Sequence, residues 1–102
     1  MIKVALVDDH QLFRKSLSLL ISSYSTMEVV FDTNDGNALL AVIAITQIDL
    51  VLLDLQMPIM DGYEVCCRLK ASYPEVKILI ISQLTSREAI HQIMECGANG
   101  FF

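Results

Sequence analysis

Basic residues are scarce in this sequence and are scattered along it. The chain has 7 Lys and Arg residues against 12 Asp and Glu residues, which gives a formal net charge of −5 at pH 7. No basic cluster occurs. Because nucleic-acid binding depends on Lys and Arg residues that neutralise phosphates, we do not expect this segment to bind nucleic acid directly.

Long apolar runs are absent as well. The longest unbroken run covers residues 38–45, whereas a transmembrane helix needs about 20 such residues. The N-terminus reaches Asp8 and Asp9 too soon for a signal peptide. We therefore expect a cytoplasmic protein with no membrane association.

The cysteines are few and odd in number. They are Cys66, Cys67 and Cys96, and neither their count nor their spacing is typical of a disulfide framework or a metal site. We expect reduced thiols that pack as small apolar side chains in a cytosolic protein.

Apolar residues, in contrast, are abundant. They make up 54% of the 102 residues, and charged residues make up 19%. This composition excludes a disordered chain, and the length suits one domain. It favours elements that are buried on more than one side, such as the strands of a parallel sheet with helices on both faces.

Short apolar runs alternate along the chain with segments of helical spacing. Strands are predicted at 2–7, 28–33, 50–53, 76–82 and from residue 99 onward. This alternation predicts an α/β fold with a doubly wound parallel sheet. The flavodoxin-like form of such a sheet has the strand order 2-1-3-4-5, which we expect for this chain.

Helices are predicted between these strands. The first turns Phe13, Leu17, Leu20, Ile21 and Tyr24 toward the core, the second covers 35–46, and the third turns Cys66, Leu69 and Tyr73 inward before Pro74. The fourth begins at a capping box with Thr85 as N-cap and Glu88, turns Ile90, Ile93 and Met94 inward, and ends at Gly97.

Acidic residues end two of the predicted strands. Asp8 and Asp9 follow the first strand and Asp54 follows the third. Each signal alone is more typical of a turn or a helix cap. Together they meet where the strand order reverses, which is where such sheets bind ligands. Because three close carboxylates repel one another, the pattern favours a hard divalent cation such as Mg²⁺.

The sequence resembles the receiver domain of two-component response regulators. The resemblance lies in residues 7–10 (VDDH), 54–62 (DLQMPIMDG) and 97–101 (GANGF), together with Ser82, and it covers the whole chain. Residues 9–14 (DHQLFR) are similar to the NarL/LuxR-type subgroup, whose second domain is a DNA-binding helix-turn-helix.

The resemblance implies a role for each acidic residue. Asp54 would accept a phosphoryl group from the histidine of a sensor kinase and form an acyl phosphate. Mg²⁺ would be held by Asp9 and Asp54 directly, by the main-chain carbonyl of Gln56, and by Asp8 through water. Such self-phosphorylation is regulatory and does not make the chain a turnover enzyme.

The resemblance also implies a switch. Ser82 would follow the phosphoryl oxygens by hydrogen bonding, and Phe101 would change rotamer as Ser82 moves. The face made by the fourth helix and the fifth strand would then change and control an output domain, which we expect to be transcriptional.

Domain limits and partners follow from the same resemblance. Residues 1–102 would be a receiver domain that stops in the fifth strand, before the family's lysine, its final helix and any DNA-binding output domain. Expected partners are a sensor histidine kinase, a second copy in a homodimer, and DNA through the output domain alone. If the chain ends at Phe102, exposed apolar surface near the fifth strand should promote self-association.

Three alternatives stay open at this point. Gln83 stands where the family has a small residue, which favours a receiver-like interaction module that is not phosphorylated; the acidic triad argues against it. An aspartyl-phosphate hydrolase lacks support because position 56 is Gln and offers no acid or base. A flavodoxin that binds FMN is disfavoured because the first strand ends in two anions.

Overall fold

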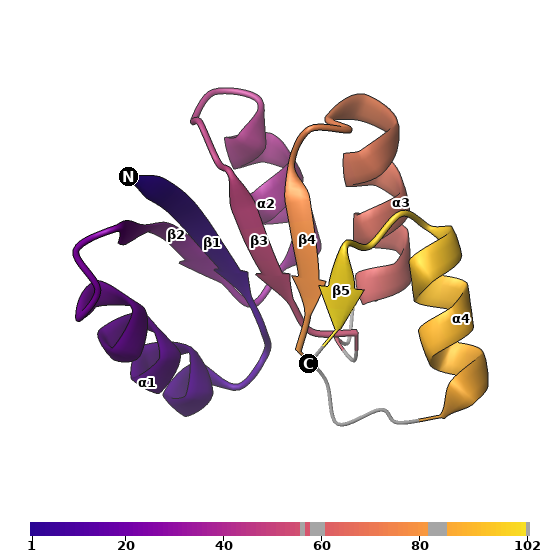
Figure 1. Cartoon of the computed structure of the whole chain (residues 1–102), viewed down its shortest axis with the longest axis horizontal. Coiled ribbons are helices and arrows are strands. Elements are labelled where there is room, and N and C mark those ends of the chain that lie inside the picture. Colours follow the sequence, from indigo (N-terminus) through magenta and orange to yellow (C-terminus); the bar gives the residue numbers. More distant parts are fainter. Residues whose placement is uncertain (56, 58–60, 82–85, 102) are drawn as a thin grey trace.

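The chain folds around one parallel sheet in this computed structural model, which describes residues 1–55, 57, 61–81 and 86–101 (Figure 1). The strands are β1 (Ile2–Val7), β2 (Met27–Thr33), β3 (Leu50–Leu53), β4 (Lys77–Ile80) and β5 (Gly100–Phe101). All pairings are parallel and the order is β2-β1-β3-β4-β5. The predicted fold class and strand order are therefore confirmed. Among the described residues, no helix combines the length and the apolar character needed to cross a bilayer.

Four described helices connect these strands. They are α1 (Gln11–Ser22), α2 (Gly36–Ile43), α3 (Gly62–Ser72) and α4 (Arg87–Glu95). Three of them begin at a residue whose side chain accepts a hydrogen bond from the first turn, namely Asp35, Asp61 and Ser86. Gly97 follows α4 with a φ of 102°, a conformation that glycine adopts without a steric penalty, as expected for a helix end.

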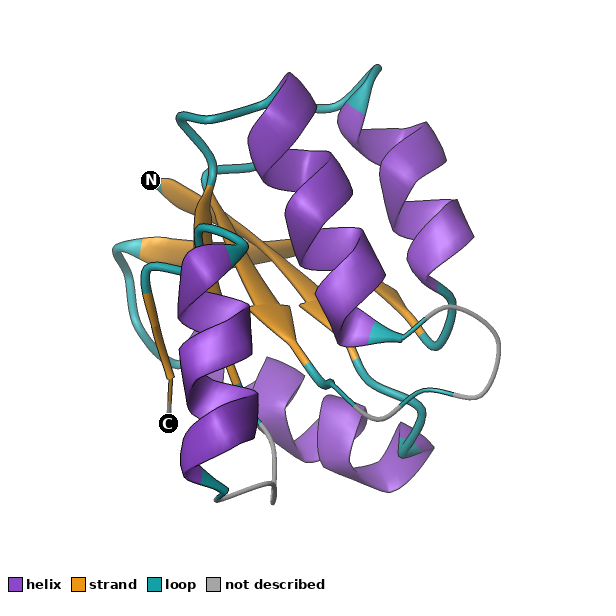
Figure 2. Cartoon of the chain, turned by 90° about the vertical axis from the view of Figure 1, so that its right-hand side faces the viewer, coloured by secondary structure: helices purple, strands orange, loops and turns teal. Residues whose placement is uncertain are grey.

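The sheet has a different core on each face. Helices α2, α3 and α4 lie side by side, whereas α1 lies apart from them beside β1 and β2 (Figures 1 and 2). Ala5 and Val7 point into the larger core with α2 and α3, while Val4 and Leu6 point into the smaller core with Ile21 of α1. This alternation along β1 is the period-two pattern of a strand covered on both faces.

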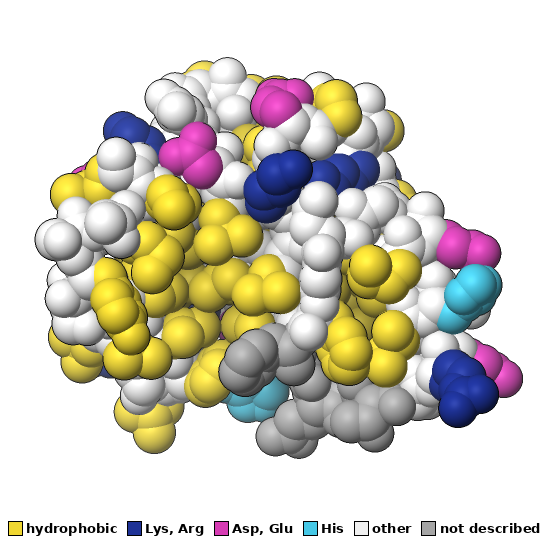
Figure 3. Space-filling model, in the orientation of Figure 1, with side chains coloured by type: hydrophobic (Ala, Val, Ile, Leu, Met, Phe, Trp, Pro, Cys, Tyr) yellow, Lys and Arg dark blue, Asp and Glu magenta, His cyan; other side chains and the backbone are white. Residues whose placement is uncertain are grey.

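The inner face predicted for α1 is only partly correct. Ile21 is buried and Leu17 is half-buried, but Phe13, Leu20 and Tyr24 are exposed. Among the described residues α1 is the one helix beside this face, so no second helix covers its flank. Apolar side chains accordingly gather on this side of the molecule over α1 and the adjoining strands (Figure 3).

Two helix boundaries also differ from the prediction. Helix α2 ends at Ile43 rather than at residue 46, and turns follow it. Helix α4 takes Ser86 as its N-cap, with the hydroxyl accepting from the main-chain N–H of Ala89, rather than Thr85. The buried face also differs from the prediction, because Ala89 is buried beside Ile93, whereas Met94 is exposed.

The prediction of three reduced cysteines is wrong for two of them. Cys67 on α3 and Cys96 at the end of α4 form a disulfide, and Cys66 is free and buried. The 29-residue separation carries no pairing signal in the sequence. The pair arises because two consecutive helices lie on the same face of the sheet.

Asp49 connects three strands where they begin, at the opposite end of the sheet from Asp8, Asp9 and Asp54. Its carboxylate accepts from the main-chain N–H of Lys3 (2.8 Å), and its carbonyl oxygen accepts from the main-chain N–H of Lys77 (3.0 Å). The Lys3 hydrogen bond, with help from the Gln47 amide, lowers the pKa of the Asp49 carboxyl below its usual value. The ionised form therefore stabilises the fold.

We expect an Asp49→Asn variant to lose less stability in acid than the wild type does. A carboxyl with a lowered folded-state pKa contributes stability above its unfolded value of about 4, and this contribution is lost as pH falls through the folded value. Urea unfolding from neutral pH to strong acid measures the free energy of unfolding of both proteins. The difference between wild type and Asp49→Asn should disappear below about pH 4. The exposed Glu75→Gln change is the charge-matched control. A gap that stays constant with pH would contradict this assignment.

Candidate functional site

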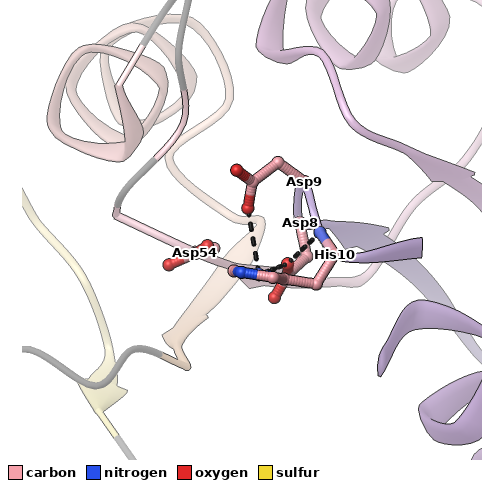
Figure 4. Close-up of side chains that lie close together, drawn as sticks. All are labelled: Asp8, Asp9, His10 and Asp54. Atoms are coloured by element: carbon pink, nitrogen blue, oxygen red, sulfur yellow. Dashed lines mark hydrogen bonds and ion pairs between the residues drawn. The ribbon is translucent and has the colours of Figure 1, made fainter. Parts of the chain in front are cut away.

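The acidic residues predicted at two strand ends do come together. Val7 and Leu53 are paired across β1 and β3, and the main-chain N–H of Asp54 donates to the carbonyl of Val7 (2.9 Å). This register places Asp8 and Asp54 side by side, one residue beyond each strand. Asp8, Asp9, His10 and Asp54 each offer a ligand atom, and these atoms lie within 4.8 Å of one another (Figure 4).

Burial differs among the three carboxylates. Asp8 is 4% exposed and Asp54 is 5% exposed, whereas Asp9 lies at the surface. Buried carboxylates occur mainly where a cation or hydrogen-bond donors compensate their charge. Two buried carboxylates beside a third at the rim thus form a negative site that opens to solvent on one side.

His10 is a member of this cluster that the sequence did not indicate. Its Nδ1 lies 2.9 Å from Oδ1 of Asp8 and 3.0 Å from Oδ1 of Asp9, although its ring is largely exposed (Figure 4). The hydrogen bond to Asp8, followed by the charge of Asp9, raises the pKa of the imidazole. His10 is also the N-cap residue of α1, but its side chain makes no capping hydrogen bond.

Arg14 holds the backbone of the cluster from the side of α1. Its Nη1 donates to the main-chain oxygen of Asp8 (2.6 Å), and its Nε donates to Oδ1 of Asp32 near the end of β2 (3.3 Å). The side chain is 15% exposed. Arg14 therefore connects α1, the end of β1 and β2, and this contact keeps the Asp8 carboxylate aligned with the strand end.

Gly62 fixes the other side of the site. Its N–H donates to the carbonyl of Leu55 (3.0 Å), so that α3 begins directly against the chain that follows Asp54. A Cβ atom at Gly62 would lie 2.5 Å from the Asp54 carbonyl oxygen and 2.7 Å from Cα of Leu55. No side chain fits there without displacing this backbone.

The remaining predicted residues have different outcomes. Met57, within the segment 54–62, is buried in the larger core. Phe101 is paired with Ile80 in β5 and is 41% exposed. Gln56, Ser82, Gln83, Thr85 and Met60 lie outside the described residues. Ile81, the residue before Ser82, donates its N–H to the carbonyl of Leu53 (2.9 Å), next to Asp54 in the chain.

The donor set suits a magnesium ion. Three carboxylates from two adjacent strand ends supply oxygen ligands, which Mg²⁺ prefers over nitrogen or sulfur. A single carboxylate at the rim leaves room for the water ligands that Mg²⁺ retains. The residues present therefore fit the cation that the sequence predicts.

Comparisons with known proteins all identify the same family. Residues 4–102 match the family described as the response regulator receiver domain. The chain is 31% identical over 100 residues both to the transcriptional regulatory protein DegU of Brevibacillus brevis and to the response regulator protein VraR of Staphylococcus aureus. These matches cover 98% of the chain but 42% and 48% of the relatives, so the chain spans less than half of their length.

A solved structure agrees with this match. The signal receiver domain of the response regulator NarL from Mycobacterium tuberculosis is 33% identical and superposes with a TM-score of 0.91, over 98% of this chain and 81% of that one. Sequence and fold thus lead to the same family.

Proposed function

Because this chain belongs to the response regulator receiver domains of two-component systems, and among them to the NarL/LuxR type, we propose that Asp54 is its phosphoryl acceptor. The observation that carries the proposal is the convergence of Asp8, Asp9 and Asp54 within one small cluster at adjacent strand ends. Phosphoryl transfer needs alignment and charge neutralisation more than it needs acid–base groups, and such a cluster is suited to that task.

The proposed reaction is a single displacement at phosphorus. A carboxylate oxygen of Asp54 attacks the phosphorus of a phosphohistidine on the sensor kinase, the P–N bond breaks, and an acyl phosphate forms on Asp54. Hydrogen bonds on both sides of Asp54, to Val7 through its own N–H and from Gly62 to Leu55, hold the acceptor in place before the reaction.

Magnesium would be held by Asp9 and Asp54 directly, by the carbonyl of Gln56, and by Asp8 through water. When bound, it supplies positive charge that offsets the carboxylates and the incoming phosphoryl oxygens. Arg14 keeps the Asp8 backbone in position without contacting the carboxylate. The family is regulatory, and we expect one phosphorylation event per signal rather than turnover.

The response to phosphorylation is proposed to run through Ser82 and Phe101. Ser82 would donate a hydrogen bond to a phosphoryl oxygen, and Phe101 would change rotamer in response. Support comes from the position of Phe101, which lies in the edge strand β5 and is partly exposed. A change at this side chain would alter the face formed by α4 and β5.

We further propose that the protein acts in the cytoplasm and receives its signal from a sensor histidine kinase. In the protein that carries this receiver domain, a DNA-binding output domain would control transcription, with a homodimer as the active form. DegU is named a transcriptional regulatory protein and VraR a response regulator, which supports this proposal.

Removal of one buried charge tests the metal site. We expect Asp8→Asn to weaken Mg²⁺ binding about 10–100-fold, as is typical when a residue that acts through the outer shell of a metal is changed. Isothermal titration calorimetry with MgCl₂ measures the Kd. Glu75→Gln removes the same formal charge from an exposed position at the opposite edge of the sheet and should leave the Kd unchanged. Equal affinity of Asp8→Asn and wild type would place the cation elsewhere.

A further inference from the structure

We propose that Cys67 and Cys96 form a reversible redox site that governs the attachment of α4 to α3. The two residues are disulfide-bonded, and their Cα atoms lie 4.9 Å apart, within the range that a disulfide requires. Cys67 lies at the middle of α3, and Cys96 is the C-cap of α4. The site is independent of the acidic cluster and goes beyond the proposed phosphorylation.

Packing between the helices brings the two cysteines together. Helices α3 and α4 lie side by side (Figure 1). At Gly97, directly after Cys96, an added Cβ would lie 2.9 Å from Cγ of Lys70, one turn beyond Cys67. The thiol of Cys66 also lies 3.9 Å from the carbonyl oxygen of Cys96. The end of α4 is therefore seated on α3 by contacts that do not depend on the bond.

The disulfide-bonded cysteines are more accessible to solvent than the free Cys66. Cys67 is exposed and Cys96 is half-buried, so an external thiol can reach the bond. Cys66 is completely buried, and burial raises the pKa of its thiol to about 11. Cys66 therefore stays a protonated thiol at neutral pH and does not compete as an internal nucleophile.

The chemistry is thiol–disulfide exchange with a low-molecular-weight thiol such as glutathione. A thiolate attacks Sγ of Cys67, the Cys67–Cys96 bond breaks, and Cys96 leaves as a thiolate that takes up a proton. A second thiolate attacks the mixed disulfide, which releases Cys67 and one low-molecular-weight disulfide. Oxidation is the reverse, with the low-molecular-weight disulfide as the oxidant.

The bond matters because, among the residues that the structure describes, few side chains of α4 itself are buried. Of its nine residues, Ala89 and Ile93 are buried, and a hydrogen bond of 3.5 Å joins Tyr63 of α3 to the carbonyl of Ala89. The loop that the disulfide closes contains β4 and the whole of α4. Cross-links of this kind stabilise mainly by restricting the open chain. Reduction should therefore loosen α4 before it affects the rest of the sheet.

The test equilibrates the full-length protein in glutathione buffers of stepped reduced-to-oxidised ratio, followed by alkylation, peptide mapping and amide hydrogen exchange. We expect oxidation to remove two reactive thiols, with Cys67 linked to Cys96, and reduction to speed exchange in residues 87–95 on the order of tenfold or more. Melting temperature should fall by roughly 10 °C on reduction.

Variants separate this pair from the neighbouring thiol. Cys67→Ser, at an exposed position, should abolish the redox dependence of exchange in α4, whereas Cys66→Ala should retain it. The proposal is overturned if no Cys67–Cys96 link forms in excess oxidised glutathione, or if Cys66→Ala removes the response. It is overturned equally if the link resists excess reduced glutathione in the folded protein, because the bond would then be permanent.

Discussion

Replacing Asp54 with asparagine is expected to abolish uptake of an acid-labile phosphoryl group from acetyl phosphate. An amide has no ionised oxygen to attack phosphorus, yet it occupies the same volume in a position that is only 5% exposed. Loss of a nucleophile commonly lowers a rate by roughly a thousandfold or more. Intact mass of the full-length protein, after incubation with Mg²⁺ and the phosphodonor, measures the result.

The control for this change is Asp35→Asn. Asp35 is the N-cap of α2 at the same edge of the sheet, and asparagine caps a helix as well as aspartate does. This variant should take up one phosphoryl group like the wild type. An Asp54→Asn protein that gains the same mass would show that another residue is the acceptor, and the assignment of Asp54 would fall.

The second large effect is expected from Gly62→Ala. The added methyl group would meet the Asp54 carbonyl oxygen at 2.5 Å and Cα of Leu55 at 2.7 Å. Both obstacles are backbone atoms that cannot rotate away, so α3 must move off the end of β3. We expect the free energy of unfolding to fall by about 3 kcal/mol, and phosphorylation to fall with it because the acceptor loses its support.

Gly100→Ala offers a matched control. Among the described residues, its added methyl group would meet the terminal Cδ1 of Leu79, at 3.3 Å, and that side chain can adjust. We expect a loss of less than about 1 kcal/mol in the free energy of unfolding. Urea unfolding compares the two variants. Equal losses at both positions would mean that the contact between α3 and the chain after Asp54 does not fix the site.

Much of this architecture could be predicted from the sequence because the rules of parallel sheets are strict. Apolar runs at 2–7 and 50–53 have no polar face, which predicts strands covered on both sides. Once these two strands are inferred to be neighbours in the sheet, the residues that follow them must lie close together. The convergence of Asp8 and Asp54 needed no knowledge of side-chain packing.

Other features depend on packing and could not be predicted. The role of Arg14 depends on a turn that brings α1 back over the main chain of Asp8 and toward Asp32. Helical spacing in α1 marks Phe13 and Leu20 as core residues, but their burial needs a neighbouring element, which spacing does not reveal. The Cys67–Cys96 bond likewise depends on how α3 and α4 lie, since adjacent cysteines suggest no particular pairing.

Chemical mapping of the modified residue tests most directly whether Asp54 accepts the phosphoryl group. The phosphorylated full-length protein is reduced with borohydride, which converts an aspartyl phosphate to homoserine, and is then digested and sequenced by mass spectrometry. We expect homoserine at position 54 and unmodified aspartate at positions 8 and 9. Homoserine at position 8 or 9, or a phosphoryl group retained on His10, would contradict the account.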